Sequence, residues 1–318
     1  MSTYITIDGG TSNTRIYLVN NQSILDTVRL SMGARKGMEN ANALKDAVKA
    51  GILEILSKNN IQEERITRIL ASGMITSEFG LCNVPHITVP AGIEELHSNM
   101  KEIYLPDISS IPFVFIPGVK TRCETLETAD IMRGEETELM GLAQIGRCAY
   151  VLPGSHSKII YTDNKNRIID FSTMLTGEMI ASISQHTILS DAVRLDIASI
   201  DSDFLLKGFR YCQKRGINEA LFKVRILKNI FQRTAEEIYS FFLGVILCQE
   251  IELLEKSPVD TIILGGREQI RNAMATILKQ TSNKEIICLS NKEVERSTSL
   301  GMVRIYEHKG KEKQHADN

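Results

Sequence analysis

The chain has 318 residues, of which 43% are apolar and 24% charged, so it can bury one large core or two ordinary ones. Its 37 basic residues against 39 acidic ones give a formal charge of -2, and no block of basic residues would bind a nucleic-acid backbone. No apolar run reaches the roughly 18 to 20 residues of a membrane span, and residues 1–19 lack the pattern of an export signal. Six scattered cysteines without a Cys-x-x-Cys pair favour reduced thiols over disulfides or a zinc site. We therefore expect a cytoplasmic globular protein that binds neither nucleic acid nor membrane.

The N-terminal part of the chain is predicted to form a mixed sheet. Alternating apolar residues predict strands, and apolar residues that recur every three to four positions predict helices. In chain order these are strands at residues 4–7, 15–19 and 24–29, a helix at 41–59, a strand at 68–71, a helix at 93–104 and a strand at 112–116. The segment thus begins with a strand hairpin and a third strand.

A similar order of elements returns in the second half. The predicted elements are a helix at 134–145, strands at 149–152, 158–161 and 167–171, a mostly helical stretch at 176–256, strands at 261–264 and 285–289 with a helix between them, and a closing helix at 293–307. The two hairpins share almost no identical residues, so the repeat is one of architecture. We expect two α/β halves, each led by an antiparallel hairpin.

Three glycine turns directly follow apolar strands, at residues 8–13, 153–158 and 264–267. Glycine lets the backbone approach a ligand closely, and the N–H groups of a tight turn bind anions. The first turn adds a carboxylate and hydroxyls, which suit a hydrated Mg²⁺ beside phosphate oxygens, and the second adds hydroxyls and a lysine. One such turn alone would more often be a simple connection, but three in this order indicate a phosphate site.

Other phosphate-binding folds do not fit, because the sequence contains neither G-x-x-x-x-G-K-[ST] nor G-x-G-x-x-G between a strand and a helix. The three turns resemble the two phosphate motifs and the adenosine motif of the actin-like ATPase superfamily, to which sugar kinases belong. This resemblance implies an α/β fold of two ribonuclease H-like domains that bind ATP and Mg²⁺ in an interdomain cleft. It predicts an N-terminal domain at residues 1–133, a C-terminal domain at 134–308 and a frayed tail at 309–318.

An acidic segment at residues 130–138 lies between the two predicted domains. Phosphoryl transfer to an alcohol needs a group that orients the hydroxyl and accepts its proton. Glu135 is the first choice for this catalytic base, with Glu136 and Asp130 as alternatives. Acids in a first helical turn also commonly complement the helix dipole, so a structural role competes evenly with catalysis.

Three segments are similar to 2-dehydro-3-deoxygalactonokinases, namely MRGEET at 132–137, PGSHSK at 153–158 and LTGE at 175–178. Residues 72–74 and 89–92 also fit the first domain of that family, and the resemblance extends from the N-terminus to the adenosine turn. It implies transfer of the γ-phosphoryl group of ATP to the C6 hydroxyl of 2-dehydro-3-deoxy-D-galactonate. The products would be the 6-phosphate and ADP, in galactonate catabolism.

The turns supply candidate contacts for the nucleotide. Asp8 is expected to hold Mg²⁺ indirectly, because a carboxylate at the end of an apolar strand needs a metal or hydrogen bonds, although turn capping is the alternative. The candidate contacts for ATP are Asp8, Gly10, Thr11, Ser12, Asn13, Gly154, Ser155, His156, Ser157, Gly265 and Gly266. For the side chains, fixing the loops through local hydrogen bonds is the competing role.

A sugar acid also needs a cation for its carboxylate. A guanidinium matches a carboxylate in two-point geometry, so Arg133 beside the expected base is favoured, with Arg122 as alternative and an ion pair as the structural role. The candidate substrate contacts are Arg133, Lys158, Gly73, Met74 and Glu178. A solvated lysine and a helix cap are the structural alternatives for Lys158 and Glu178.

Other functions stay open at this point. A kinase of another sugar or sugar acid would share the fold, and a non-kinase ATP switch of the actin type would share the turns. A sugar-acid sensor without nucleotide consumption is a third possibility. The expected partners are a small sugar acid and ATP, and a homo-oligomer is compatible with the sequence.

Overall fold

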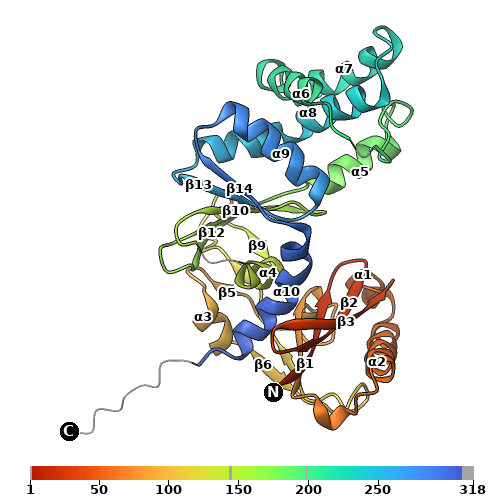
Figure 1. Ribbon diagram of the computed structural model, residues 1–318, viewed down its shortest axis with the longest axis vertical. Helices are drawn as coiled ribbons and strands as arrows, with labels where there is room; N and C mark the ends of the chain where they lie inside the picture. The colour runs from red at the N-terminus through yellow and green to blue at the C-terminus, as the bar shows by residue number, and fades with distance from the viewer. Residues whose placement is uncertain (1, 143–144, 198, 310–318) are drawn as a thin grey trace, which may run out of the picture. The chain divides into compact units, whose positions relative to one another are not determined.

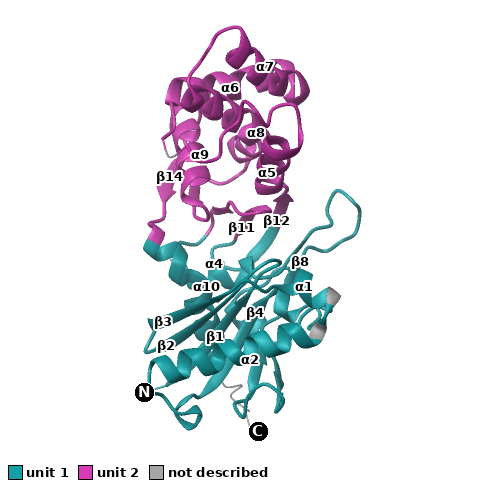
Figure 2. Ribbon diagram, turned by 90° about the vertical axis from the view of Figure 1, so that its right-hand side faces the viewer, with its two compact units in different colours: residues 1–146, 163–170, 292–318 teal, residues 147–162, 171–291 magenta. Residues whose placement is uncertain are grey.

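The computed structural model describes residues 2–142, 145–197 and 199–309, which form two compact units (Figure 2). Unit 1 contains the described residues within 1–146, 163–170 and 292–318, and unit 2 contains those within 147–162 and 171–291. The predicted tail at 309–318 lies outside the described residues except for Lys309. Among the described helices, none combines the length and the apolar character that a membrane crossing requires.

Unit 1 is built on a six-stranded sheet in the order β3-β2-β1-β4-β7-β6, of which Figure 1 labels β1, β2, β3 and β6. Its strands are β1 (Thr3–Gly9), β2 (Thr14–Asn20), β3 (Ser23–Leu30), β4 (Arg68–Gly73), β6 (Lys101–Ile103) and β7 (Phe113–Phe115). The strands β1, β2 and β3 are antiparallel neighbours, and β4 runs parallel to β1. A small sheet in the order β5-β8-β9 joins β5 (Ile87–Thr88), β8 (Val119–Lys120) and β9 (Ile131–Met132).

The helices of unit 1 are α1 (Ala34–Glu39), α2 (Ala41–Lys58), α3 (Ile93–Ser98), α4 (Glu135–Gly141) and α10 (Asn291–Tyr306), with short 3-10 turns η1 (Glu63–Arg65) and η2 (Met74–Thr76). The apolar face of α2, with Leu44, Val48 and Ile52, is buried in one cluster with Ile16 and Val28 of the sheet. This burial removes apolar surface from water on a helix whose spacing of apolar residues the sequence already predicts.

Unit 2 is built on a five-stranded sheet in the order β12-β11-β10-β13-β14. Its strands are β10 (Ala149–Leu152), β11 (Ser157–Thr162), β12 (Ile168–Met174), β13 (Thr261–Leu264) and β14 (Glu285–Cys288). The first part of β12, residues 168–170, is counted with unit 1. The helices of unit 2 are α5 (Thr176–His186), α6 (Ser202–Arg215), α7 (Ile217–Asn229), α8 (Ala235–Lys256) and α9 (Glu268–Thr281). The strand β10 pairs antiparallel with β11 and parallel with β13. This repeats the pairing of β1 with β2 and β4, so the predicted architectural repeat is confirmed.

The structure differs from the predicted elements in several places, among them α1, which was not predicted, and α4, which ends at Gly141. The helix predicted at 93–104 ends at Ser98, and Lys101–Ile103 instead forms the edge strand β6, antiparallel to β7. Pairing with a distant strand overrides local helical spacing there. The small sheet was not predicted, because strands of two residues carry no periodic pattern.

The contacts also divide the chain differently from the predicted boundary after Arg133. The helices α4 and α10 both belong to unit 1. They cross closely, because a Cβ on Gly141 would lie 1.7 Å from the Ser297 carbonyl oxygen, and one on Gly301 would lie 1.9 Å from that of Thr137. The C-terminal helix therefore joins the unit that holds the N-terminus.

Candidate active site

The carboxyl ends of β1 and β4 lie side by side at the first glycine turn. Their parallel register pairs Asp8 with Ser72 and Gly9 with Gly73. A Cβ on Gly9 would lie 2.5 Å from the Cβ of Ile75, and one on Gly73 would lie 2.5 Å from the carbonyl oxygen of Gly9. Gly73 also has a φ of 82°, which side chains disfavour. Only glycine at these positions lets the two strands end in contact.

The start of α4 meets the end of β4. Gly134, with a φ of 118°, would place a Cβ 3.3 Å from the Cα of Gly73. The hydroxyl oxygens of Ser72 and Thr137 lie 2.6 Å apart, and both side chains are buried. These contacts fix the first turn of α4 against the strand.

Glu136 is fully buried and caps its own helix. Each of its two carboxylate oxygens lies 2.8 Å from the Gly134 nitrogen, which donates, and the Thr137 hydroxyl donates at 3.1 Å. Burial raises the pKa of Glu136 to about 7, and the charge of Glu135 adds to this rise. A carboxylate without exposed surface is poorly placed to meet a hydroxyl, so these contacts favour the structural role for Glu136.

Glu135 is half-buried and lies near two further carboxyl groups. Its Oε2 accepts a hydrogen bond from the Arg133 N–H at 3.2 Å. Burial raises the pKa of Asp8 and raises that of Glu138 to about 8, and the charge of Glu135 contributes to both rises. The Nη1 of Arg15 lies 3.4 Å from Asp8 Oδ2 and lowers the pKa of Asp8. Three carboxyl groups and one guanidinium therefore share one electrostatic environment.

Glu138 is the member of this group that the sequence analysis missed. It follows Glu135 by three positions on α4, a spacing that brings two side chains to the same helix face. The three-residue spacing between the two acids could have predicted from the sequence that Glu138 lies beside Glu135.

The guanidinium of Arg133 is occupied by acceptors of the protein. Its Nη1 donates to the carbonyl and hydroxyl oxygens of Thr76 at 2.8 and 2.6 Å. Its Nη2 donates to the Val84 carbonyl at 2.9 Å and lies 3.2 Å from Nδ1 of His86. Burial, aided by the Arg133 charge, lowers the pKa of His86 to about 4, so its neutral ring can accept this hydrogen bond. These contacts favour a structural role for Arg133, which holds the segment after η2, over the predicted contact with a substrate carboxylate.

Asp130 lies in the connection between β8 and β9. Its Oδ1 accepts from the Ile131 N–H at 2.7 Å, and its own N–H donates to the Thr121 hydroxyl at 2.7 Å. These bonds favour a hairpin role for Asp130 over that of a base. Of the expected substrate contacts, Gly73 ends β4 beside Gly134 at the start of α4, and Met74 is the first residue of η2.

The first glycine turn is closed by its own backbone and by α1. The Gly10 N–H donates to the Asn13 carbonyl at 2.8 Å, and the carbonyls of Gly10 and Thr11 accept from N–H groups at the start of α1 at 3.1 and 3.0 Å. The side chains of Thr11, Ser12 and Asn13 are exposed. Their hydroxyl and amide groups therefore face solvent, where an anion can reach them.

In unit 2, the second and third glycine turns are in contact. The N–H groups of Gly265 and Arg267 donate to the carbonyls of Val151 and Pro153 at 2.8 and 2.9 Å. Gly266 has a φ of 61°, and a Cβ there would lie 2.3 Å from the Pro153 carbonyl oxygen. The two turns thus form one continuous region of unit 2.

The start of α5 packs on the second turn. A Cβ on Gly177 would lie 2.2 Å from the Gly154 carbonyl oxygen, and the Glu178 N–H donates to the Ser155 carbonyl at 3.1 Å. The Glu178 carboxylate lies 3.1 Å from Nε2 of His156. His156 and Glu178 therefore bind each other, which favours a loop-fixing role for this pair.

Ser157 and Lys158 are both buried at the start of β11. The Ser157 hydroxyl donates to Oε2 of Glu250 at 2.8 Å, so this hydrogen bond is made inside the protein and not to a ligand. Lys158 is 4% exposed, which is inconsistent with the alternative of a solvated lysine.

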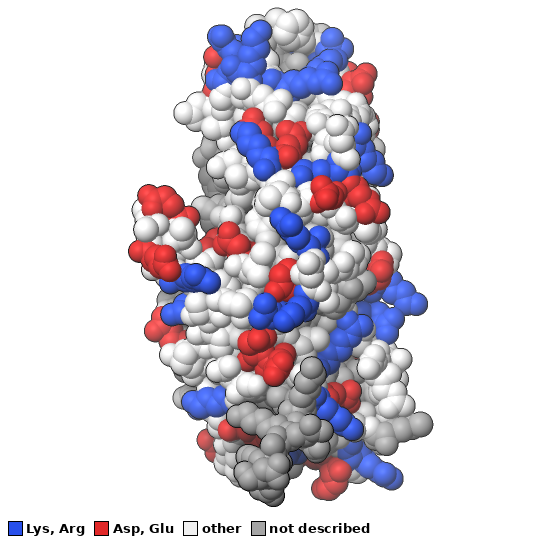
Figure 3. Space-filling model, turned by 90° about the vertical axis from the view of Figure 1, so that its left-hand side faces the viewer, with Lys and Arg blue, Asp and Glu red and all other residues white. Residues whose placement is uncertain are grey.

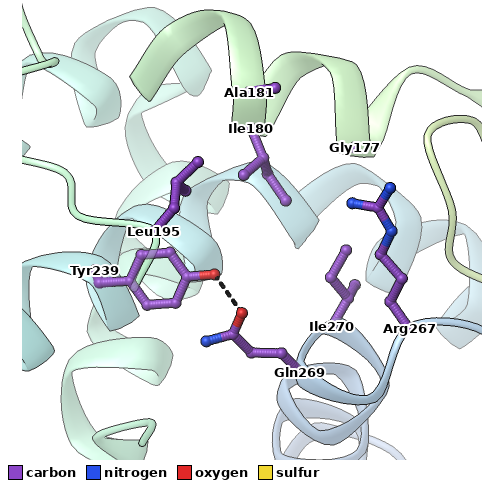
Figure 4. A pocket seen from close by; sticks show the side chains of 8 residues that line it. All are labelled: Gly177, Ile180, Ala181, Leu195, Tyr239, Arg267, Gln269 and Ile270. Atoms are coloured by element: carbon purple, nitrogen blue, oxygen red, sulfur yellow. Dashed lines mark hydrogen bonds between the residues drawn. The ribbon is translucent and has the colours of Figure 1, made fainter. Parts of the chain in front are cut away.

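A pocket of about 180 Å³ lies beside these turns in unit 2 (Figure 4). It is lined by Gly177, Ile180, Ala181, Leu195, Tyr239, Arg267, Gln269 and Ile270. The Arg267 side chain extends toward the start of α5 at Gly177, and the Tyr239 hydroxyl donates to Gln269 Oε1 at 3.0 Å (Figure 4). Its walls combine apolar side chains with a guanidinium and an amide, and its volume lies below the roughly 300 to 1,000 Å³ of typical small-molecule sites.

The family model of 2-keto-3-deoxy-galactonokinase matches residues 8–304, which covers parts of both units. The chain belongs to the 2-keto-3-deoxy-galactonokinase family. It is 26% identical over 254 residues to the 2-dehydro-3-deoxygalactonokinase of Escherichia coli K12, covering 78% of this chain and 79% of that protein.

Solved structures show the same fold. A crystal structure of a candidate 2-dehydro-3-deoxygalactonokinase from Sinorhizobium meliloti superposes with a TM-score of 0.75 at 24% identity, covering 95% of this chain and 97% of the other. The activator of a 2-hydroxyisocaproyl-CoA dehydratase from Clostridium difficile, solved with bound ADPNP, superposes with a TM-score of 0.51 at 10% identity, covering 95% and 94%. These likenesses confirm the predicted actin-like ATPase fold.

All candidate site residues lie inside the region that matches the 2-keto-3-deoxy-galactonokinase family. Within unit 1, the structure brings together Asp8, Gly73 and the acidic start of α4. Within unit 2, it brings together the turns at 153–158 and 264–267 and the start of α5. Each unit of this family member therefore has one cluster of candidate residues.

The pKa of Glu136 leads to a prediction about stability. Its folded value of about 7 lies above the ordinary 4.5, so the stability from proton binding is fully present below about pH 4.5 and is lost as the pH rises through about 7. We expect the free energy of unfolding of the wild type to fall by about 1–3 kcal/mol relative to Glu136→Gln between pH 5 and pH 8. Urea unfolding across this range measures the difference.

Glu295→Gln, an exposed substitution on α10, is the matched control. Its stability should run parallel to that of the wild type. If Glu136→Gln also runs parallel to the wild type, the buried carboxyl does not titrate in this range.

Proposed function

We propose that the protein transfers the γ-phosphoryl group of ATP to the C6 hydroxyl of 2-dehydro-3-deoxy-D-galactonate, giving the 6-phosphate and ADP, in galactonate catabolism. The observation that carries the proposal is the family match over residues 8–304. The name of the Escherichia coli relative supports the same substrate. An acidic helix start in unit 1 and glycine turns in unit 2 supply the group types that such a reaction needs.

Unit 2 is proposed to bind the nucleotide. The pocket beside the glycine turns has apolar walls from Ile180 and Ile270, which suit a flat base, and the guanidinium of Arg267 at its edge. The backbone at Gly154 and Ser155, which packs on the same turns, would receive the phosphates. The bound ADPNP in the dehydratase activator supports nucleotide binding by this fold in that protein.

Unit 1 is proposed to supply the base. Glu135 is half-buried rather than enclosed, and it lies near Asp8 at the end of β1. In the transfer, the acceptor oxygen bonds to the γ-phosphorus, the bond from that phosphorus to the β,γ-bridging oxygen breaks, and the hydroxyl proton passes to Glu135. ADP leaves with the electron pair of the broken bond.

Mg²⁺ would accompany the nucleotide at Asp8. Among the described residues, no group of three or more His, Cys, Asp or Glu side chains is placed to hold a metal ion. Mg²⁺ in phosphoryl-transfer sites keeps several waters and is bound through one or two carboxylates together with substrate phosphates, which one partly exposed Asp8 fits. The ion would neutralise charge on the phosphate oxygens.

The carboxylate of the sugar acid needs a cation other than Arg133, whose guanidinium is occupied. Arg122, the alternative to Arg133, is exposed and directly follows β8 and Thr121. We therefore assign the carboxylate contact to Arg122, with Gly73 and Met74 near the reacting hydroxyl.

The proposal includes a cytoplasmic location and no nucleic-acid partner. On the face drawn in Figure 3, the described basic side chains are interspersed with acidic ones. The interspersed charges of this face, together with the formal charge of -2, give little attraction for a polyanion.

A panel of keto-deoxy sugar acids, aldonates and hexoses in an ADP-release assay tests the function. We expect turnover to be highest with 2-dehydro-3-deoxy-D-galactonate. Preference for another acceptor would assign the protein to a different sugar kinase activity. ATP-dependent sedimentation without turnover of any acceptor would instead favour an actin-type switch.

Replacing the base should slow catalysis without preventing nucleotide binding. We expect Glu135→Gln to lower kcat roughly 10²- to 10⁴-fold, because the amide cannot accept the hydroxyl proton. The KM for ATP should stay within about twofold, since Glu135 is assigned no contact with the nucleotide. Glu64→Gln, an exposed acid of η1, is the control and should retain full turnover. Unchanged kcat in Glu135→Gln would remove Glu135 from this role.

Filling the pocket should weaken ATP binding. Ala181 lines the pocket, so Ala181→Phe is expected to raise the KM for ATP about tenfold or more while the KM for the sugar acid stays nearly constant. Ser182→Phe places the same ring on the exposed side of α5 and is the matched control. Equal KM values for ATP in both variants would show that the base does not occupy this pocket.

A further inference from the structure

Glu250 is a buried carboxylate that does not belong to the acidic segment at 130–138. It belongs to α8 in unit 2 and is 2% exposed. Burying a carboxylate is costly unless hydrogen bonds replace its water. Its hydrogen-bond partners therefore indicate what it does.

Two hydroxyl groups satisfy this carboxylate. Ser157 donates to Oε2 at 2.8 Å, and Thr176 donates to Oε1. Burial raises the pKa of Glu250, and the hydrogen bonds from Thr176 and Ser157 oppose this rise. Each oxygen thus holds a different segment of the chain.

Both segments border the candidate nucleotide site. Ser157 is the first residue of β11, directly after the second glycine turn, and Thr176 is the first residue of α5. The next residue of α5, Gly177, touches the Gly154 carbonyl and also lines the pocket. A substitution of Glu250 would therefore alter the second glycine turn and the wall of the pocket at the same time.

We propose that Glu250 is a positioning residue for nucleotide binding, which holds the turn at 153–156 and the start of α5 in one arrangement. This inference rests on the proposed function. Glu250 acts through Ser157 and Thr176 and has no assigned contact with ATP. The apolar interior of unit 2 surrounds α8, so a carboxylate there has its two hydroxyl partners in place of water.

The test compares Glu250→Ala with Ile251→Ala. Ile251 is the next residue of α8 and is fully buried in the apolar cluster of unit 2. Its truncation therefore destabilises the same helix without removing a side-chain hydrogen bond. We expect Glu250→Ala to raise the dissociation constant for ADP, and the KM for ATP, about tenfold or more. The KM for the sugar acid should change less than about twofold, and Ile251→Ala should leave ADP binding nearly unchanged.

Three further variants separate positioning from general destabilisation. Ser157→Ala and Thr176→Ala each remove one hydrogen bond to Glu250. Each should weaken ADP binding by a smaller factor than Glu250→Ala does. Glu250→Gln keeps the length of the side chain and a carbonyl acceptor, so it should recover most of the affinity for ADP. These milder changes also give a result if Glu250→Ala does not fold.

The outcomes distinguish this inference from the proposed function. Equal ADP affinity in the wild type, Glu250→Ala and both hydroxyl variants would overturn the positioning role while nucleotide binding stands. An equal loss of affinity in Glu250→Ala and Ile251→Ala would also overturn it. General destabilisation of unit 2 would then be enough to explain the weaker ADP binding. A wild type that binds no ADP would overturn the nucleotide site itself.

Discussion

Close contact between backbones at glycine residues is the constraint on which both candidate sites depend. In unit 1, the ends of β1 and β4 and the start of α4 meet at Gly9, Gly73 and Gly134, where added Cβ atoms would come within 2.5 to 3.3 Å of neighbouring atoms. In unit 2, Gly177 and Gly266 bring α5 and the third turn onto the second one. Side chains beside these glycines are therefore placed by backbone contact rather than by flexible loops.

Each unit adds a buried carboxylate that holds the start of a helix. Glu136 accepts from the backbone of Gly134 and from Thr137, and Glu250 accepts from Thr176 at the start of α5 and from Ser157. In both units the helix begins next to a glycine turn or strand end that carries candidate ligand groups. The cost of burying charge is offset by hydrogen bonds that exist only in one arrangement of the chain.

The sequence was a good guide to the repeated hairpins, because buried strands and amphipathic helices carry their period in the order of residues. It was a poor guide at Lys101–Ile103, where pairing with β7 decides the conformation. At the candidate sites it predicted roles for Asp8 and Glu135, since acids at a strand end and a helix start stand out locally. It assigned the guanidinium of Arg133 to a substrate, whereas acceptors at Thr76 and Val84 occupy it.

The sequence by itself determined the family, the order of strands and helices and the three glycine turns, because these depend on residue types at short spacing. Only the tertiary structure decided that Glu136 is enclosed while Glu135 stays partly exposed, although the two are neighbours in the chain. It also paired Ser157 with Glu250 across 93 positions. Burial and hydrogen-bond partners arise from contacts between distant segments, so no local pattern of residues encodes them.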